Sequence, residues 1–190
     1  NTSIIHIFKY MKKNILSIVI LFTLTTQAFT HVEHYKDFNL LKFELFRNNK
    51  LIGYHNYKFE KKNDILDITS IVEFKITKLG VDLYKYDAVS KEKYKGNQLI
   101  NFSSNTNQNK KIKNTEIIFD EKKKKLIISG SENQLSSPKE YPVGTWWNHE
   151  IVQAKAQISA ISGRIIEQKV TFLGKEKINL YGKTYEALRF

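Results

Sequence analysis

The stretch ILDITSIVEFKIT, residues 65–77, decides the fold. Every second residue forms one mostly apolar set: Leu66, Ile68, Ser70, Val72, Phe74 and Ile76. The intervening set is mostly polar: Ile65, Asp67, Thr69, Ile71, Glu73 and Lys75. Because successive side chains of a strand point to opposite faces, this alternation predicts a long strand with one buried face.

Similar alternating segments flank this strand on both sides, separated by short turns. We expect strands at 38–46, 51–59, 81–94, 98–106, 112–120, 126–129, 164–173, 177–180 and 184–190. Asn, Asp and Gly in the turns tolerate left-handed backbone conformations. The sequence therefore predicts a mainly β fold, a curved antiparallel meander sheet (half-barrel-like) of about eight to ten strands.

Two segments interrupt the strand pattern. Residues 131–145 contain both prolines and form the longest predicted loop. Apolar residues then recur at spacings of 4, 3 and 4, at Trp147, Ile151, Ala154 and Ile158. This is one face of a helix, so we expect one short helix from about Asn148 to Ala160, packed on the sheet.

The N-terminal region resembles a secretory signal. Met11 is the only methionine, and Lys12 and Lys13 precede the ten-residue apolar run 15–24. Small residues ending at Ala28 complete a cleavage pattern. We expect residues 1–10 to be upstream non-native translation, 11–28 a signal-peptide helix, and 29–190 one β-rich domain.

The alternative for the apolar run is an uncleaved transmembrane anchor. Ten helical residues span only about 15 Å of a hydrocarbon core about 30 Å thick, which favours cleavage. Cleavage near Ala28 predicts an exported protein, periplasmic or extracellular, that meets the membrane only through an uncleaved signal segment. The chain ends at Phe190 within an expected strand, so we expect C-terminal truncation.

The charge balance is strongly basic. Lys and Arg number 31 against 19 Asp and Glu, a net charge of +12. Only Arg47, Arg164 and Arg189 are arginine, the residue that binds phosphate through two parallel hydrogen bonds. We therefore interpret the lysines as a solvated surface or an affinity for an anionic membrane, and expect no nucleic-acid partner.

Familiar catalytic signatures are missing. The sequence has no phosphate-binding loop, dinucleotide fingerprint, zinc helix motif, paired-carboxylate motif or Gly-x-Ser-x-Gly elbow. It has no cysteine, which excludes disulfides and thiol nucleophiles. His31, Glu33 and His34 are metal-ligand types, but a chain terminus lacks the surrounding contacts that a stiff site needs. We predict no catalytic residue, metal or cofactor.

Aromatic residues give the only candidate ligand site. Trp146 and Trp147 are adjacent, Ile151 follows one turn later, and Tyr84 and Tyr86 share one strand face. These five residues either pack in the core or line an apolar cavity.

Several short motifs are shared with a known family: Leu51-Ile52-Gly53, the strand Val81–Tyr86, Trp146-Trp147-Asn148, and the turns Gly174-Lys175-Glu176 and Tyr181-Gly182-Lys183. Over about residues 34–190 the chain resembles a family of uncharacterised exported bacterial proteins with a domain of unknown function. The resemblance implies a strongly curved antiparallel sheet similar to periplasmic lipoprotein carriers, and no reaction. Members usually continue through a Trp-Tyr-Asp step that this chain lacks, which agrees with truncation.

Three functions stay open. The leading hypothesis is a non-enzymatic periplasmic binding or carrier module for an apolar or amphiphilic ligand, such as a lipid. The second is an envelope structural or assembly factor that pairs with another envelope protein through a sheet edge. The third is a hydrolase with a non-local site, in which His55 or His149 meets a serine or an acid inside a cleft.

Overall fold

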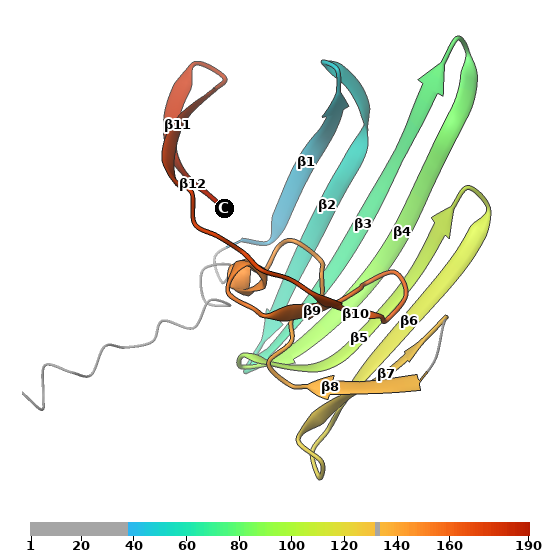
Figure 1. Ribbon diagram of the computed structural model, residues 1–190, viewed down its shortest axis with the longest axis vertical. Coiled ribbons are helices and arrows are strands. Elements are labelled where there is room, and N and C mark those ends of the chain that lie inside the picture. Colours follow the sequence, from blue (N-terminus) through green and yellow to red (C-terminus); the bar gives the residue numbers. More distant parts are fainter. Residues whose placement is uncertain (1–37, 132–133) are drawn as a thin grey trace, which may run out of the picture. The chain divides into compact units, whose positions relative to one another are not determined.

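The computed structural model describes residues 38–131 and 134–190 (Figure 1). The predicted signal peptide, the ten residues before it and the N-terminal histidines lie outside these residues. An eight-stranded sheet is formed by β1 (Leu40–Arg47), β2 (Lys50–Lys62), β3 (Ile65–Lys78), β4 (Val81–Lys95), β5 (Gln98–Gln108), β6 (Lys111–Asp120), β7 (Lys125–Gly130) and β8 (Gln134–Pro138). Each strand pairs antiparallel with the next one in the chain. The predicted mainly β antiparallel meander is thus confirmed, and the sheet is not closed, with β1 and β8 at its edges.

The turns between the strands use the residues that the sequence indicated. Asn48, Asn49 and Asn63 have φ values of 50°, 59° and 56°, and Gly80 has a φ of 79°. Asn and Gly adopt this left-handed region at the lowest cost, so local chemistry fixes the hairpins and hence the register.

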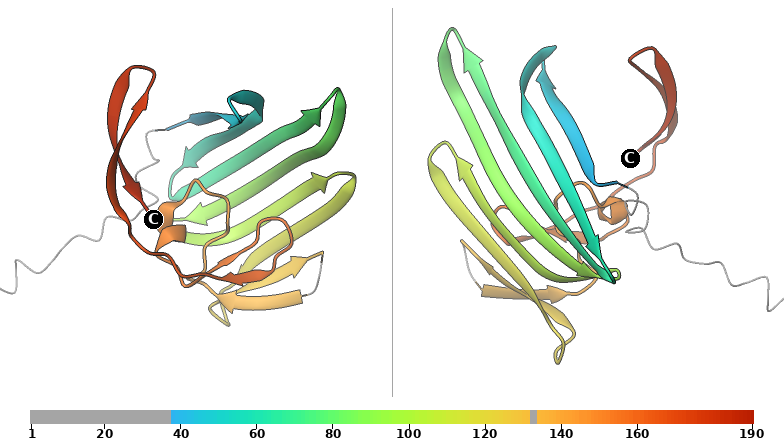
Figure 2. Two further views of the ribbon diagram at one scale, coloured as in Figure 1. Left: turned by 45° about the horizontal axis from the view of Figure 1, so that its top comes forward. Right: turned by 180° about the vertical axis from the view of Figure 1, so that it is seen from behind.

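One face of the sheet is partly covered by residues 139–168, here called the covering segment. It contains a 3₁₀ turn, η2 (His149–Val152), and two short strands, β9 (Ala156–Ile158) and β10 (Ile165–Glu167). Figure 2 shows these elements in front of the sheet. The core lies between the covering segment and the sheet: Tyr57, Phe59, Leu66, Ile68, Tyr94, Leu99, Phe102, Ile117, Leu126, Ile128, Val143, Trp147 and Ile158. We call the sheet face that carries this core the inner face.

The predicted helix from Asn148 to Ala160 is wrong. Only His149–Val152 are helical, in a single 3₁₀ turn capped by the Asn148 side chain. The chain then becomes extended, because Ile158 donates its N–H to Pro142 O and accepts from Gly144 N, both at 2.9 Å. The apolar spacing did identify buried residues, since Trp147, Ile151 and Ile158 are 3%, 6% and 0% exposed. A turn followed by a strand buries them as well as a helix would.

Two further boundaries differ from expectation. The predicted loop 131–145 contains β8, which pairs with β7. The predicted strand 164–173 is reduced to β10, which pairs with β9. The last two strands, β11 (Gly174–Leu180) and β12 (Lys183–Arg189), form a separate two-stranded sheet.

No helix in the described part of the chain has the length and apolar character needed to span a bilayer.

Candidate functional site

A row of hydroxyl side chains crosses the inner face of the sheet. Tyr57 pairs with Ser70, Ser70 with Ser90, Ser90 with Ser104, and Ser104 with Thr115, from β2 to β6. Directly paired residues have Cβ atoms about 4.5–5.5 Å apart and point to the same face. The meander therefore aligns one hydroxyl side chain per strand, from tyrosine, serine or threonine, into a polar band under the covering segment.

A cavity of about 260 Å³ lies along this band. We call it the hydroxyl cavity. The sheet contributes His55, Ser70, Val72, Tyr86, Ala88, Ser90, Ser104 and Thr106. The covering segment contributes Gly144, Thr145, Trp146, Gln157, Ser159, Ala160, Ile161 and Ile166. Its wall is therefore a mixture of hydroxyl groups, small aliphatic side chains and aromatic rings.

His55 forms a directed hydrogen-bond chain at this cavity. The Tyr57 hydroxyl donates to Thr145 O and lies 3.4 Å from His55 Nδ1. Because Tyr57 gives its only proton to a carbonyl, its oxygen can only accept from the imidazole. This places the histidine proton on Nδ1 and leaves Nε2 to accept from Ser70 Oγ, 2.9 Å away. Burial lowers the pKa of His55, so the imidazole is neutral at pH 7.

A carboxyl group is buried beneath the covering segment. Glu92, on β4, is 2% exposed. It accepts a 2.7 Å hydrogen bond from Trp147 Nε1 and a 3.0 Å bond from the Tyr94 hydroxyl. Burial raises the pKa of Glu92 to about 7, although hydrogen bonds from Trp147, Thr145 and Tyr94 oppose the shift.

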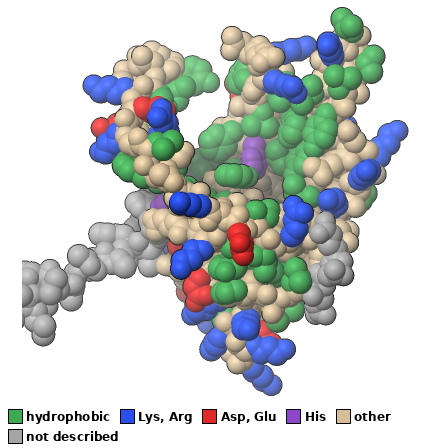
Figure 3. Space-filling model, in the orientation of Figure 1, with side chains coloured by type: hydrophobic (Ala, Val, Ile, Leu, Met, Phe, Trp, Pro, Cys, Tyr) green, Lys and Arg blue, Asp and Glu red, His purple; other side chains and the backbone are tan. Residues whose placement is uncertain are grey.

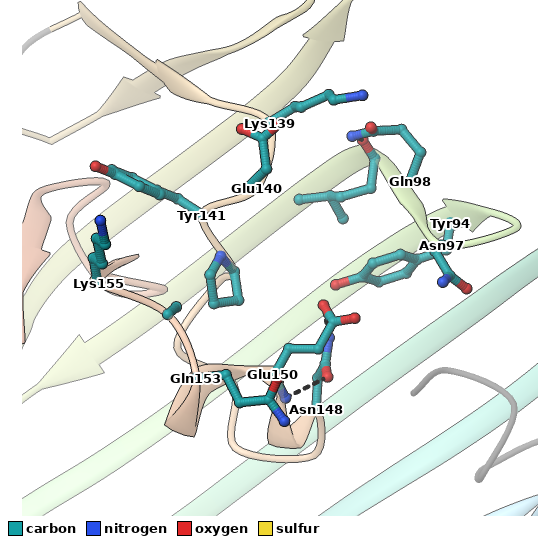
Figure 4. Close-up of a pocket in the computed structure, with 13 residues that line it drawn as sticks. Tyr94, Asn97, Gln98, Lys139, Glu140, Tyr141, Asn148, Glu150, Gln153 and Lys155 are labelled. Carbon is teal, nitrogen blue, oxygen red and sulfur yellow. Dashed lines mark hydrogen bonds between the residues drawn. The ribbon is translucent and has the colours of Figure 1, made fainter. Parts of the chain in front are cut away.

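A second, more charged cleft lies beside Tyr94 (Figure 4). This polar cleft has a volume of about 510 Å³. It is lined by Asn97 from the β4–β5 turn, by Gln98 at the start of β5, and by residues of the covering segment, including Lys139, Glu140, Glu150 and Lys155. Figure 4 shows the Tyr94 hydroxyl pointing toward Glu150. Burial, followed by the nearby charge of Glu92, raises the pKa of Tyr94 well above its ordinary value.

Thr145 connects the two sites. Its carbonyl accepts from Tyr57 beside the hydroxyl cavity, and its hydroxyl, which lies 3.5 Å from Val143 O, is close enough to Glu92 to lower the pKa of that carboxyl. Glu92 in turn accepts from Tyr94, which lines the polar cleft. A continuous buried polar network therefore runs beneath the covering segment from one site to the other, and it fixes this segment to the sheet.

Beyond the covering segment the inner face continues as an aromatic surface. Phe74 of β3 lies against Tyr84 and Tyr86 of β4, with ring centroids 5.7 and 5.2 Å apart. We call these three residues the aromatic face. They are only half-buried, and Figure 3 shows hydrophobic side chains gathering around a hollow in this view.

The structure separates the five predicted ligand residues. Trp147 and Ile151 are buried in the core. Trp146 is 72% exposed and lines the hydroxyl cavity, with an unusual φ of 68°. Tyr86 lines the same cavity, and Tyr84 belongs to the aromatic face. Only the last three are thus accessible to a ligand.

Comparison with known proteins gives a family but no activity. The model of a domain of unknown function, DUF6134, matches residues 43–190. The chain belongs to this family. No curated protein and no solved structure matches it significantly. The DUF6134 match covers β1 from Phe43 onward and all of β2 to β12, so both sites lie inside the family domain.

Sequence reasoning missed Glu92, Thr145 and the serine row of this DUF6134 domain. One signal was available: Tyr84, Tyr86 and Ala88 share a strand face, and the same alternation continues through Ser90, Glu92 and Tyr94. An acid at a core-facing position between two polar or aromatic residues indicates a buried polar site. Thr145 had no comparable signal, because its partners are distant in sequence.

In the described residues, no group of three or more His, Cys, Asp or Glu side chains is arranged to hold a metal ion.

Proposed function

We propose that this DUF6134 domain is a binding module for an amphiphilic ligand. The polar part of the ligand occupies the hydroxyl cavity, and its apolar part lies on the aromatic face. The observation that carries the proposal is the double role of Tyr86, which lines the hydroxyl cavity and stacks on Phe74. A polar pocket and an apolar surface that share one side chain form a single continuous site.

The exposed fractions of the apolar side chains support this proposal. Phe43 of β1, which pairs with His55 on the inner face, is 48% exposed. Val72, Phe74, Ile76 and Tyr84 on the same face are half-buried. Large contiguous apolar patches on a protein surface mark sites where another molecule binds. The expected location in the periplasm would give such a site access to lipids and their derivatives.

An uncharged apolar dye tests this proposal. N-phenyl-1-naphthylamine is expected to gain fluorescence on binding the chain, and Phe74→Ala is expected to weaken binding roughly 3- to 10-fold through the loss of ring stacking. Phe172→Ala is the matched control, because Phe172 is 57% exposed and stacks only on Phe190 among the ring contacts of the described residues. Absence of binding, or equal loss in both variants, would contradict the proposal.

One observation favours the hydrolase alternative as a second candidate. His55 presents an unprotonated Nε2 to Ser70 Oγ at 2.9 Å, the arrangement of a general base beside a nucleophile. In such a reaction Ser70 would attack an ester carbonyl while its proton moves to His55, which then protonates the leaving alcohol. Water would afterwards hydrolyse the acyl-serine to a carboxylic acid.

A fluorophosphonate probe separates this candidate from simple binding. If Ser70 is activated, the intact chain gains one adduct, and peptide mapping places it on Ser70. The adduct is then lost in His55→Gln but kept in Ser129→Ala, which removes an exposed serine of β7. An unlabelled wild-type chain, or an adduct on another residue, rejects the candidate.

A further inference from the structure

The charge of the hydroxyl cavity limits the ligands that it can accept. None of its lining residues is Asp, Glu, Lys or Arg. This contrasts with the chain as a whole, which has 31 basic and 19 acidic residues, and with the polar cleft, where Lys139, Glu140, Glu150 and Lys155 are present.

The two titratable residues of the cavity are also held neutral. Burial lowers the pKa of His55 and raises the pKa of Tyr86, so both shifts favour the uncharged form. A charged group that entered the cavity would lose hydration and find no counter-ion on the wall. Because unpaired charge is expensive to bury, the wall selects against anionic and cationic groups.

The wall nevertheless offers unsatisfied hydrogen-bonding groups. The Ser90 side chain forms no hydrogen bond with any described residue and lies in the middle of the hydroxyl row. Thr106 Oγ1 is sealed from solvent next to the Tyr86 hydroxyl, so Ser90 is the hydroxyl of this pair that a ligand can reach. Buried polar groups need partners, and a hydroxyl both donates and accepts. The complementary ligand group is another hydroxyl.

Trp146 adds a flat apolar surface at the same cavity. Its indole is 72% exposed although the side chain lines the cavity. Its backbone adopts a left-handed φ of 68°, which is rare for a bulky residue. An aromatic ring beside a set of neutral hydroxyl groups suits a ring or chain that carries both C–H and O–H groups.

We infer that the head group of the ligand is an uncharged polyol, such as a sugar or glycerol, rather than a phosphate, carboxylate or ammonium group. This inference rests on the proposed function and specifies its ligand class. The polyol hydroxyls exchange hydrogen bonds with Ser90, and Trp146 lies against the carbon skeleton.

Amphiphiles with one chain length and different head groups test the inference. Isothermal titration below the micelle concentration compares octyl glucoside, monooctanoylglycerol, octyl phosphate and octyltrimethylammonium. At least one neutral probe is expected to bind roughly 10-fold or more tightly than both charged probes. The sugar and glycerol arms identify which polyol fits the cavity.

Single substitutions then locate the contact. Ser90→Ala is expected to weaken the preferred neutral probe roughly 3- to 10-fold, the effect of one hydrogen bond. Ser129→Ala leaves the affinity for this probe unchanged, since Ser129 is exposed on β7.

Charged probes that bind as tightly as neutral ones overturn the inference but leave the proposed function standing. Absence of binding by all four probes overturns both the inference and the proposed function. If Ser90→Ala binds the preferred neutral probe as tightly as the wild type does, Ser90 is not the contact and the inference is overturned.

Discussion

Trp147→Ala is expected to lower the free energy of unfolding by about 3–5 kcal/mol, the range for truncating a buried tryptophan. Trp147 is 3% exposed and contacts Phe59 and Tyr94 edge to face, with ring centroids 5.8 and 5.6 Å away. The substitution also removes the indole N–H that donates to Glu92. Both losses act on the contact between the covering segment and the sheet.

The neighbouring residue provides the control. Trp146→Ala removes an equally large side chain that is 72% exposed, and the expected change is within about 0.5 kcal/mol. Urea denaturation followed by far-UV circular dichroism measures both variants. Equal destabilisation by the two substitutions would show that the covering segment does not depend on Trp147.

The pH dependence of stability is expected to reveal Glu92. Its pKa rises from the ordinary value of 4.5 in the unfolded chain to about 7 in the fold. Below 4.5 both states hold the proton, and between the two values only the folded state does. The contribution of Glu92 to the free energy of unfolding is therefore fully present below pH 4.5 and is lost as the pH rises through 7. The total loss is about 3 kcal/mol.

Glu92→Gln isolates this contribution. Glutamine cannot ionise, and its carbonyl oxygen can still accept from Trp147 Nε1. His55 acts in the opposite direction, because its lowered pKa makes the fold more stable as pH rises. The informative quantity is thus the difference between wild type and Glu92→Gln from pH 4 to 8. Glu121→Gln is the control, because Glu121 is an exposed acid in the β6–β7 turn. If the difference in the free energy of unfolding between wild type and Glu92→Gln is constant from pH 4 to 8, the raised pKa of Glu92 is contradicted.

The sheet was predictable because its information is local. The alternation in residues 65–77 and the Asn and Gly turns define strand, face and register between sequence neighbours. The helix prediction failed because a spacing of 4, 3 and 4 reports burial and not backbone conformation. Ile158 is buried in an extended segment, and its hydrogen bonds to Pro142 and Gly144 come from residues outside the predicted helix.

The candidate site was less predictable because its contacts are distant. Tyr84, Tyr86 and Trp146 were identified from aromatic clustering, and Tyr86 and Trp146 do line the hydroxyl cavity. The partnership of Trp147 with Glu92 could not be predicted, since these residues are 55 positions apart and no periodicity relates them. The sequence therefore leaves Trp147 open between the core and a ligand cavity, whereas in the structure its partner is a buried carboxyl group.

The meander has a further consequence for contact order. Every ladder of the eight-stranded sheet joins strands adjacent in sequence, and the turns between β1 and β7 are short. By contrast, Ser104 reaches Ala160 across 56 residues and Tyr57 reaches Thr145 across 88. The entropic cost of closing a loop grows with the separation of its ends along the chain. The contacts with the highest such cost in this fold are therefore those between the covering segment and the sheet. The candidate site is thus the least local part of an otherwise local architecture.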